Sequence, residues 1–350
     1  MRASVWSARL AWALCAGAGL CAGSASAQLP STPQAPAKLT DPAPKAFEPK
    51  AADPAAAPAI PDMFGAGSPY DSGDLGGGAL STMDSAVGYV DSAIPASQFR
   101  LRTDAAWRNN RPTRAEFFYP QYQPGGPGLP APDSSIDYQI VSAYLEGALN
   151  PDFSIFVEAP FRFINPTIND NSAGFSDLQV GFKYALLTCP DSVTTFQTRL
   201  SFPTGDADRG LGNHLYTVEP ALLSYNQLSD RLRVESELRL WVPIDGTSFA
   251  GPVLRYGIGI SFGERNPDDF WIAPVVELVG WTVLGGRESV SPSPSPRFVA
   301  DACGDTIVNA KFGVRMGLGN LFDIYTGYGR ALTGEVWYKD VWRTELRIGF

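Results

Sequence analysis

The chain has 350 residues, with 36 acidic and 27 basic side chains, a net charge of −9 and a mean hydropathy of −0.07. This acidic balance, without a basic stripe of interleaved aromatic residues, disfavours nucleic acid as a partner. His214 is the one histidine, which excludes a zinc site of several imidazoles, and the sequence predicts no metal or cofactor.

The first 27 residues are predicted to be a cleaved secretory signal peptide. Arg2 and Arg9 form a basic region, and residues 10–20 are apolar but too few to span a bilayer as a helix. Residues 25–27 (Ala-Ser-Ala) offer the small side chains that signal peptidase requires. We therefore expect export in a Gram-negative cell.

Residues 28–85 are predicted to be a periplasmic linker. The part 28–61 has nine prolines and ten alanines and almost no large apolar residue, so it cannot bury a core. Residues 86–97 form a pre-barrel segment. Two interpretations of residues 81–97 stay open. They form either a solvated linker, which we favour, or a plug that folds into the barrel formed by the rest of the chain.

Apolar and polar residues alternate from Gln98 to Phe350, in short segments separated by turn residues. This period of two indicates strands, and twelve such segments give the even number that a single-chain bacterial barrel requires. The sequence therefore predicts an all-β fold, an antiparallel twelve-stranded transmembrane β-barrel of the outer-membrane type over residues 98–350. The predicted strands are 98–108, 135–147, 153–164, 177–187, 193–202, 214–226, 231–242, 250–262, 270–284, 306–317, 321–329 and 341–350. In 270–284 both faces are apolar, so its inward face is ambiguous.

The connections between predicted strands alternate in length. Those after the even-numbered strands are short, and most of those after the odd-numbered strands are longer, up to residues 109–134 and 285–305. Outer-membrane barrels have short periplasmic turns and long outer loops. This arrangement puts Cys189 and Cys303 at opposite ends of the barrel, beyond the reach of a disulfide.

One face of the predicted strands is crowded with charges, and we assign it to the lumen. The predicted lumen-lining residues are Arg100, Arg102, Asp104, Glu158, Arg162, Lys183, Arg199, Arg233, Glu235, Glu237, Arg239, Arg255, Lys311, Arg315, Arg343, Glu345 and Arg347. These charges either pair into a network that closes the interior or line a narrow water-filled path with a mild anion preference. We favour the path slightly.

Aromatic residues gather near strand ends, where rings favour the level of the lipid headgroups. The predicted girdle is Phe99, Trp107, Trp241, Trp271, Trp342 and Phe350. The terminal Phe350 also resembles the signature by which the barrel assembly machinery recognises its clients. Expected partners are therefore this machinery, outer-membrane lipid with its lipopolysaccharide, and, for residues 28–61, peptidoglycan.

Two motifs carry a family resemblance: residues 174–184 (Gly-Phe-Ser-Asp-Leu-Gln-Val-Gly-Phe-Lys-Tyr) and 202–206 (Phe-Pro-Thr-Gly-Asp). They resemble outer-membrane transporters of the phenol-degradation MetA-pathway family, and the likeness extends loosely over residues 135–350. The whole chain is also similar to planctomycete outer-membrane β-barrels. The resemblance implies a barrel that takes up small solutes, aromatic or otherwise hydrophobic, and it supplies no catalytic residues.

Three functions follow, in order of preference. The first is an outer-membrane channel for passive passage of small solutes through a charged lumen. The second is a structural anchor that links the outer membrane to the cell wall. The third is a hydrolase at the barrel rim, which depends on His214 with Asp206 or Asp208; a solvated loop histidine and an ordinary turn explain these residues better, so we expect no enzyme.

Overall fold

The computed structural model describes residues 80–81, 84–110, 128–131, 133–244, 250–265, 269–289, 299–334 and 336–350. The predictions for the signal peptide and for most of the linker lie outside these residues. Among the described residues, no helix is long and apolar enough to cross a membrane.

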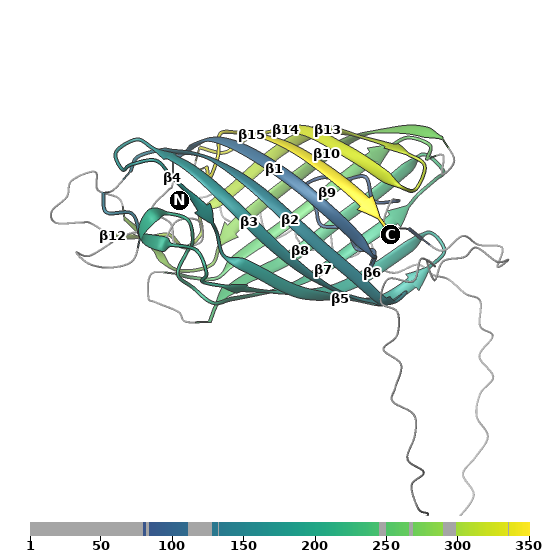
Figure 1. Ribbon diagram of the computed structural model, residues 1–350, viewed down its shortest axis with the longest axis horizontal. Helices are drawn as coiled ribbons and strands as arrows, with labels where there is room; N and C mark the ends of the chain where they lie inside the picture. Colours follow the sequence, from purple (N-terminus) through teal and green to yellow (C-terminus); the bar gives the residue numbers. More distant parts are fainter. Residues whose placement is uncertain are drawn as a thin grey trace, which may run out of the picture. The chain divides into compact units, whose positions relative to one another are not determined.

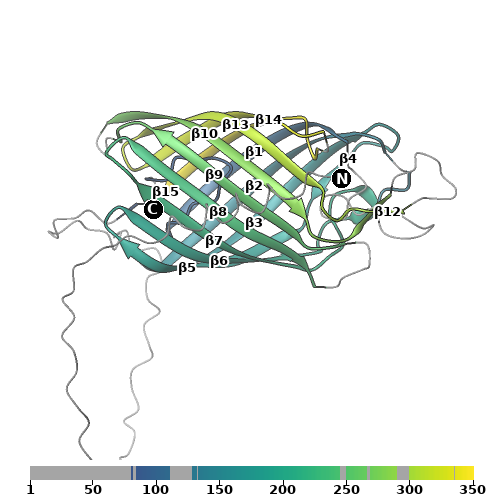
Figure 2. The ribbon, with the colours of Figure 1, turned by 180° about the vertical axis from the view of Figure 1, so that it is seen from behind.

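The described chain forms one closed antiparallel barrel (Figure 1), which Figure 2 shows from behind. The main sheet contains 13 strands, but β4 and β5 follow each other along one side of β3, so the barrel has 13 − 1 = 12 strand positions. Closure is made by β1 and β15, where Gln98 pairs with Gly349 and Trp107 with Asp340. The predicted twelve-stranded barrel is confirmed.

The strand bounds lie within a few residues of those predicted. The barrel strands are β1 (Gln98–Asn109), β2 (Ile136–Asn150), β3 (Phe153–Pro166), β4 (Ser172–Phe175), β5 (Leu178–Cys189), β6 (Ser192–Phe202), β7 (Thr217–Gln227), β8 (Leu232–Pro243), β9 (Val253–Phe262), β10 (Phe270–Val283), β13 (Thr306–Leu318), β14 (Phe322–Ala331) and β15 (Asp340–Gly349). A small separate hairpin, β11 (Arg287–Ser289) with β12 (Val299–Asp301), lies in a connection for which no strand was predicted.

The barrel has an apolar outside and a charged inside. Along β10, Ile272, Val276 and Leu278 are exposed, whereas Trp271 and Glu277 on the other face are buried. Most barrel strands repeat this alternation, because successive side chains point to opposite faces of a sheet, and irregularities interrupt it in β1, β2 and β5. Large exposed apolar residues of this outer belt include Leu101, Leu145, Ile155, Leu186, Leu222, Ile260, Phe312, Ile324 and Trp342. Such a belt around a closed barrel is stable in lipid and defines an outer-membrane protein.

Two of the predicted girdle residues lie inside the barrel. Trp107, Trp342 and Phe350 are exposed, and Phe99 shares the outward face of Leu101. Trp271 is only 4% exposed and shares the inward face of Glu277; Trp241 shares that of Arg239 and packs against buried apolar residues. The prediction for these two was wrong, because it followed their position near strand ends and not the alternation of the strand.

The two ends of the barrel differ. Five short turns, the start of β1 and the C-terminus lie at one end, called the turn end below, and the longer connections lie at the other, the loop end. β5 ends at Cys189, which lies at the turn end. Cys303 precedes β13 at the loop end, and it is exposed and free.

Candidate functional site: a plugged lumen

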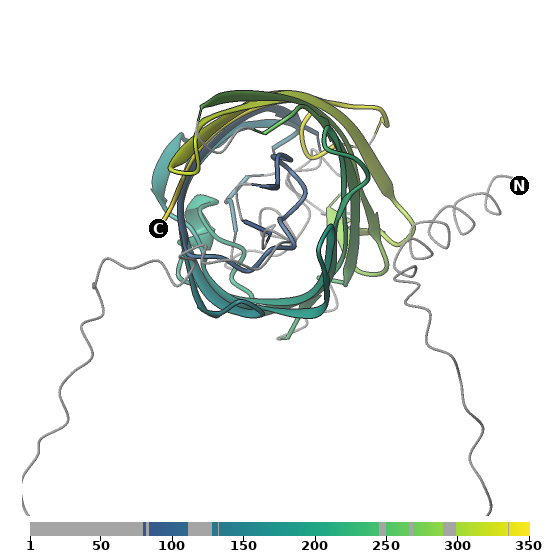
Figure 3. The ribbon, with the colours of Figure 1, turned by 90° about the vertical axis from the view of Figure 1, so that its right-hand side faces the viewer.

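Residues 84–97, called the plug below, run through the inside of the barrel, where Figure 3 shows them encircled by the strands. At the turn end, Asp84 forms an ion pair with Arg265 of the β9–β10 turn. Apart from Asp84, Asp91 and Ser97, the plug residues are buried, and the segment continues directly into β1. The favoured prediction of a solvated linker is therefore wrong for this stretch, because its small and apolar side chains fill the bore.

Two glutamates of the wall accept hydrogen bonds from successive backbone N–H groups of the plug. Glu235 accepts from the N–H groups of Ala86 (3.1 Å) and Val87 (3.4 Å) and from the hydroxyl of Ser85 (2.7 Å). Glu277 accepts from three consecutive N–H groups, those of residues 88–90, at 3.2, 2.8 and 2.9 Å. Consecutive N–H groups that converge in this way form a concave anion-binding nest. The plug thus presents two nests, and the wall fills each with a carboxylate.

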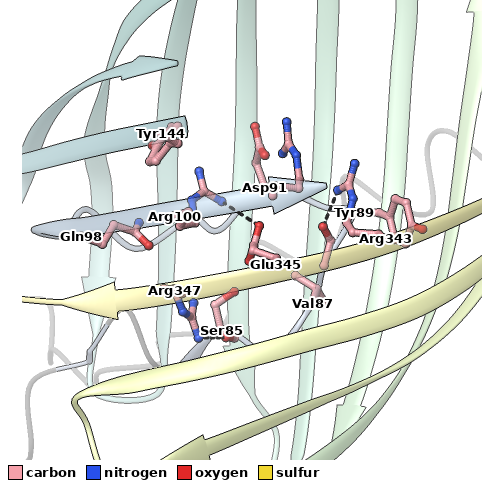
Figure 4. A network of polar contacts seen from close by, with 12 residues as sticks. Ser85, Val87, Tyr89, Asp91, Gln98, Arg100, Tyr144, Arg343, Glu345 and Arg347 are labelled. Atoms are coloured by element: carbon pink, nitrogen blue, oxygen red, sulfur yellow. Dashed lines mark hydrogen bonds and ion pairs between the residues drawn. The ribbon is translucent and has the colours of Figure 1, made fainter. Parts of the chain in front are cut away.

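Arginines of the wall satisfy the plug carbonyls. Arg315 donates to the carbonyl oxygens of Ala86 (3.0 Å) and Val87 (2.8 Å), and Arg347 donates to that of Ser85 (2.8 Å; Figure 4). A buried backbone group without a partner is costly, and a segment with no strand or helix of its own must find partners elsewhere. Side chains of the barrel supply them here. The carbonyls of Gly88 and Tyr89 are bound likewise, by Arg343 and Arg255.

The wall is also shaped to the plug side chains. A Cβ added at Gly259 would lie 2.4 Å from Cγ1 of Val87, and one at Gly257 would lie 3.0 Å from Cγ2 of Val90. These luminal glycines of β9 therefore leave the space that the two valines occupy. Two cations lie over the ring of Tyr89: Nζ of Lys311 is 3.6 Å and the guanidinium carbon of Arg343 is 4.0 Å from its centre, and the ring stabilises both charges inside the barrel.

Asp91 is the plug residue that pairs with arginines of β6 and β8. Its carboxylate forms ion pairs with Arg239 and with Arg199 (3.2 Å). Other luminal charges pair along the wall, as in Arg315–Asp323 (2.5 Å) and Arg102–Glu158 (2.5 Å). Of the two interpretations that the sequence left open, the ion pairs among the described residues support the paired network.

All seventeen residues predicted to line the lumen lie on the inward face. Those buried there are Glu158, Lys183, Arg199, Arg233, Glu235, Glu237, Arg239, Lys311, Arg315, Glu345 and Arg347; the half-buried ones are Arg100, Arg102, Asp104, Arg162, Arg255 and Arg343. Sequence reasoning missed Glu146 and Glu277. Glu146 accepts from Lys183 (3.1 Å) and from Gln98 (2.6 Å), and the one charge within an otherwise apolar β10 was the available signal for Glu277.

The loop end of the lumen is filled differently. Trp337 and Tyr338, from the β14–β15 connection, pack against Trp281 of β10 with ring centroids 5.3 and 6.4 Å apart. Burial raises the pKa of the Tyr338 hydroxyl, which therefore stays neutral at ordinary pH. This cluster is aromatic, and cations of the lumen lie against it: Nζ of Lys311 is 5.4 Å and the guanidinium carbon of Arg255 is 5.7 Å from the centre of the Trp281 ring.

The two motifs of the family resemblance meet at Asp177. Its carboxylate lies in the interruption between β4 and β5 and accepts hydrogen bonds from the N–H groups of Gly205 (3.0 Å) and Asn213 (2.8 Å). Both belong to the connection 203–216, whose Leu211 and Leu215 are buried. The motifs therefore fix this connection against the barrel wall.

The residues considered above for a hydrolase at the barrel rim lie in the same connection, residues 203–216. His214, Asp206 and Asp208 are exposed, and Asp208 accepts a hydrogen bond from the N–H group of Gly128 (3.2 Å). Within the described part of the chain, no three His, Cys, Asp or Glu side chains are grouped so as to hold a metal ion.

A closed barrel with an apolar belt, a charged interior and a segment of its own chain inside is a plugged outer-membrane β-barrel. Solved structures similar to it include an outer-membrane channel from Pseudomonas putida F1 (13% identity, TM-score 0.48, 75% of this chain and 98% of that one). The NanC porin (9%, TM-score 0.41, 71% and 100%) and the β domain of the Bordetella autotransporter BrkA (12%, TM-score 0.43, 73% and 100%) are also similar. At these identities and scores, the likenesses carry no argument about substrate.

No family model and no curated protein matches the chain. The resemblance to the phenol-degradation MetA-pathway family therefore stays a prediction.

Proposed function

We propose that the protein is an outer-membrane channel for small solutes, and that the plug closes it at rest. The observation that carries this proposal is the way the plug is held. Its backbone is bound by side chains of Glu235, Glu277, Arg315 and Arg347, and it adds no strand to the barrel. Withdrawal of the plug leaves the closed barrel intact and exposes a lumen lined with charges.

Polar contacts of this kind can be exchanged. Each hydrogen bond between plug and wall can be replaced by one to water or to a polar solute, so its net contribution is modest, about 0.5–1.5 kcal/mol for a neutral pair and about twice that for a charged one. Both ends of the plug lie at the turn end of the barrel, where Asp84 and Gln98 are located. The plug can therefore withdraw through that end without passing through the lumen.

The aromatic cluster at the loop end supports a preference for solutes with an aromatic ring. Trp281, Trp337 and Tyr338 pack together at the loop end, and an aromatic solute that displaces one of these rings can pack against the others in its place. The alternative function, an anchor to the cell wall, depends on residues 28–61, which lie outside the described residues, and it stays a prediction.

A valine placed at Gly259 tests the proposal in the full chain. Because an added Cβ already meets Val87 at 2.4 Å, Gly259→Val displaces the plug. Overpacking of this kind costs about 1–3 kcal/mol, equivalent to a shift of about 5- to 150-fold toward the open state. Single-channel recording in planar bilayers should show rare openings for the wild type and frequent ones for Gly259→Val.

Two variants serve as controls. Val87→Gly, combined with Gly259→Val, restores the space and should restore closure. Gly147→Val makes the same change where nothing lies within 4 Å of the added Cβ, and it should behave as the wild type. A folded Gly259→Val barrel, judged by heat-modifiable mobility on a gel, that opens no more often than the wild type would refute the proposed channel.

A further inference from the structure

We infer that Arg199 and Arg239 form a luminal binding site for the carboxylate of a small solute, and that Asp91 of the plug occupies this site at rest. This inference rests on the proposed channel function and adds the chemical class of the solute. A solute anion that takes the place of Asp91 competes directly with the closed state.

The site is built and buried. Arg199 projects inward from β6 and Arg239 from β8, and both pair with the same oxygen of Asp91, Oδ2. The side chain of Arg239 is 1% exposed, so its charge has little water to solvate it. A buried guanidinium needs an anionic partner, because an unpaired buried charge is strongly destabilising.

The local charge balance specifies the ligand. The basic members of the cluster are Arg102, Arg199, Arg239, Arg255 and Arg343, and its acidic members are Asp91, Asp104, Glu158, Glu219 and Glu237. Besides the two pairs of Asp91, they are joined by Arg102–Glu158 (2.5 Å), Arg102–Asp104 (3.8 Å), Arg343–Asp104 (2.6 Å), Arg199–Glu158 (3.7 Å), Arg239–Glu219 (3.4 Å), Arg239–Glu237 (3.8 Å) and Arg255–Glu237 (2.5 Å). Five positive charges thus meet five negative ones, and withdrawal of Asp91 leaves an excess of one positive charge. A single carboxylate restores neutrality.

The arginines also have unused hydrogen-bonding capacity. The Nε atoms of Arg199 and Arg239 are buried and have no hydrogen-bond acceptor among the described residues. Arginine binds a free carboxylate best with two parallel N–H groups, one to each oxygen. Asp91, held by its backbone in the plug, reaches the pair through one oxygen. A mobile carboxylate can therefore engage the site more fully than Asp91 does.

The test compares two uncharged plug variants in the full-length protein. Asp91→Asn empties the site of its carboxylate, and Asp84→Asn removes the same charge at the turn end, where its partner is Arg265. Acetate and benzoate are the probes, with acetamide and benzamide as neutral controls, all at constant chloride. In single-channel recordings, both acids should reduce the current through Asp91→Asn in a saturable way, and the amides should not.

A second readout does not need an open channel. Benzoate should raise the midpoint of thermal unfolding of Asp91→Asn in detergent by a few degrees, and it should not raise that of the wild type or of Asp84→Asn. Adding Arg239→Gln, or separately Arg199→Gln, to Asp91→Asn should abolish both effects.

The outcomes separate the two proposals. Conducting Asp91→Asn channels that are neither blocked nor stabilised by the acids would overturn the carboxylate site and leave the channel standing. Stabilisation by benzoate without conductance in any variant would support the site and contradict the channel. Equal effects of benzoate and benzamide would overturn the site, because the carboxylate would then make no contribution.

Discussion

The two halves of the lumen differ in the contacts that occupy them. At the turn end, the plug is held by carboxylates and guanidinium groups that bind its backbone, as Glu277 and Arg315 do. At the loop end, a chain connection inserts aromatic rings, with Trp337 against Trp281. The polar contacts of the plug can be exchanged for contacts to a charged solute or to water, whereas the ring contacts at the loop end cannot.

This difference assigns separate roles to the two halves. Hydrogen bonds and ion pairs lose little when water takes the place of one partner, whereas separating packed rings exposes apolar surface. The turn end is therefore suited to open and close, and the loop end to select and to stabilise.

The largest effect is expected from Glu277→Ala. The change leaves the N–H groups of Gly88, Tyr89 and Val90 without their acceptor inside the barrel. Each unsatisfied buried group costs about 1–3 kcal/mol, so plug docking should weaken by several kcal/mol. Hydrogen exchange of residues 85–91 should accelerate strongly while the strands stay protected. Unchanged exchange in the plug would show that Glu277 does not hold it.

Trp337→Ala should produce the opposite pattern. Truncation of a packed tryptophan costs about 3 kcal/mol or more, and here the loss falls on the loop end. The midpoint of thermal unfolding should fall, and exchange of residues 85–91 should stay as in the wild type. Accelerated exchange in the plug would mean that the two halves open together.

Arg231→Ala should have the smallest effect. Arg231 pairs with Glu264 at 3.0 Å at the rim of the turn end, and the two side chains are 61% and 66% exposed. Exposed pairs of this kind contribute less than about 1 kcal/mol. The variant therefore controls for charge removal near the plug, and a change in channel opening as large as that of Gly259→Val would argue against specific plug contacts.

The sequence predicted the barrel well because each strand carries its own alternating pattern. The plug carries no such pattern: its partners are spread over β8, β10, β13 and β15, and only the closed barrel brings them together. Two features of the sequence pointed to the plug. The strand with two apolar faces, β10, packs its inner Val275 and Val279 in one cluster with Ala86, Val87 and Val90 of the plug. Gly257 and Gly259 stand where other strands carry luminal side chains.

The carboxylate site could be predicted only in part. Arg199 and Arg239 were assigned to the lumen from alternation alone, because strand parity fixes the face of each residue. Their partner Asp91 lies on a segment whose path the sequence did not specify. The placement of Trp241 and Trp271 in the girdle was wrong for a related reason. The alternation along a strand decides whether a side chain faces the lumen or the lipid, even close to the end of the strand.

The most direct test of the account is a reversible lock between plug and wall. The added Cβ at Gly259 lies 3.4 Å from Cβ of Val87, close to the separation that a disulfide requires, so the Val87→Cys, Gly259→Cys pair should crosslink in a Cys303→Ser background. Single-channel recording of one bilayer before and after reduction gives the answer. If residues 84–97 close the channel, no openings will occur while the disulfide is intact, and openings will appear after reduction. Equal conductance in the two states would contradict the claim that residues 84–97 close the channel.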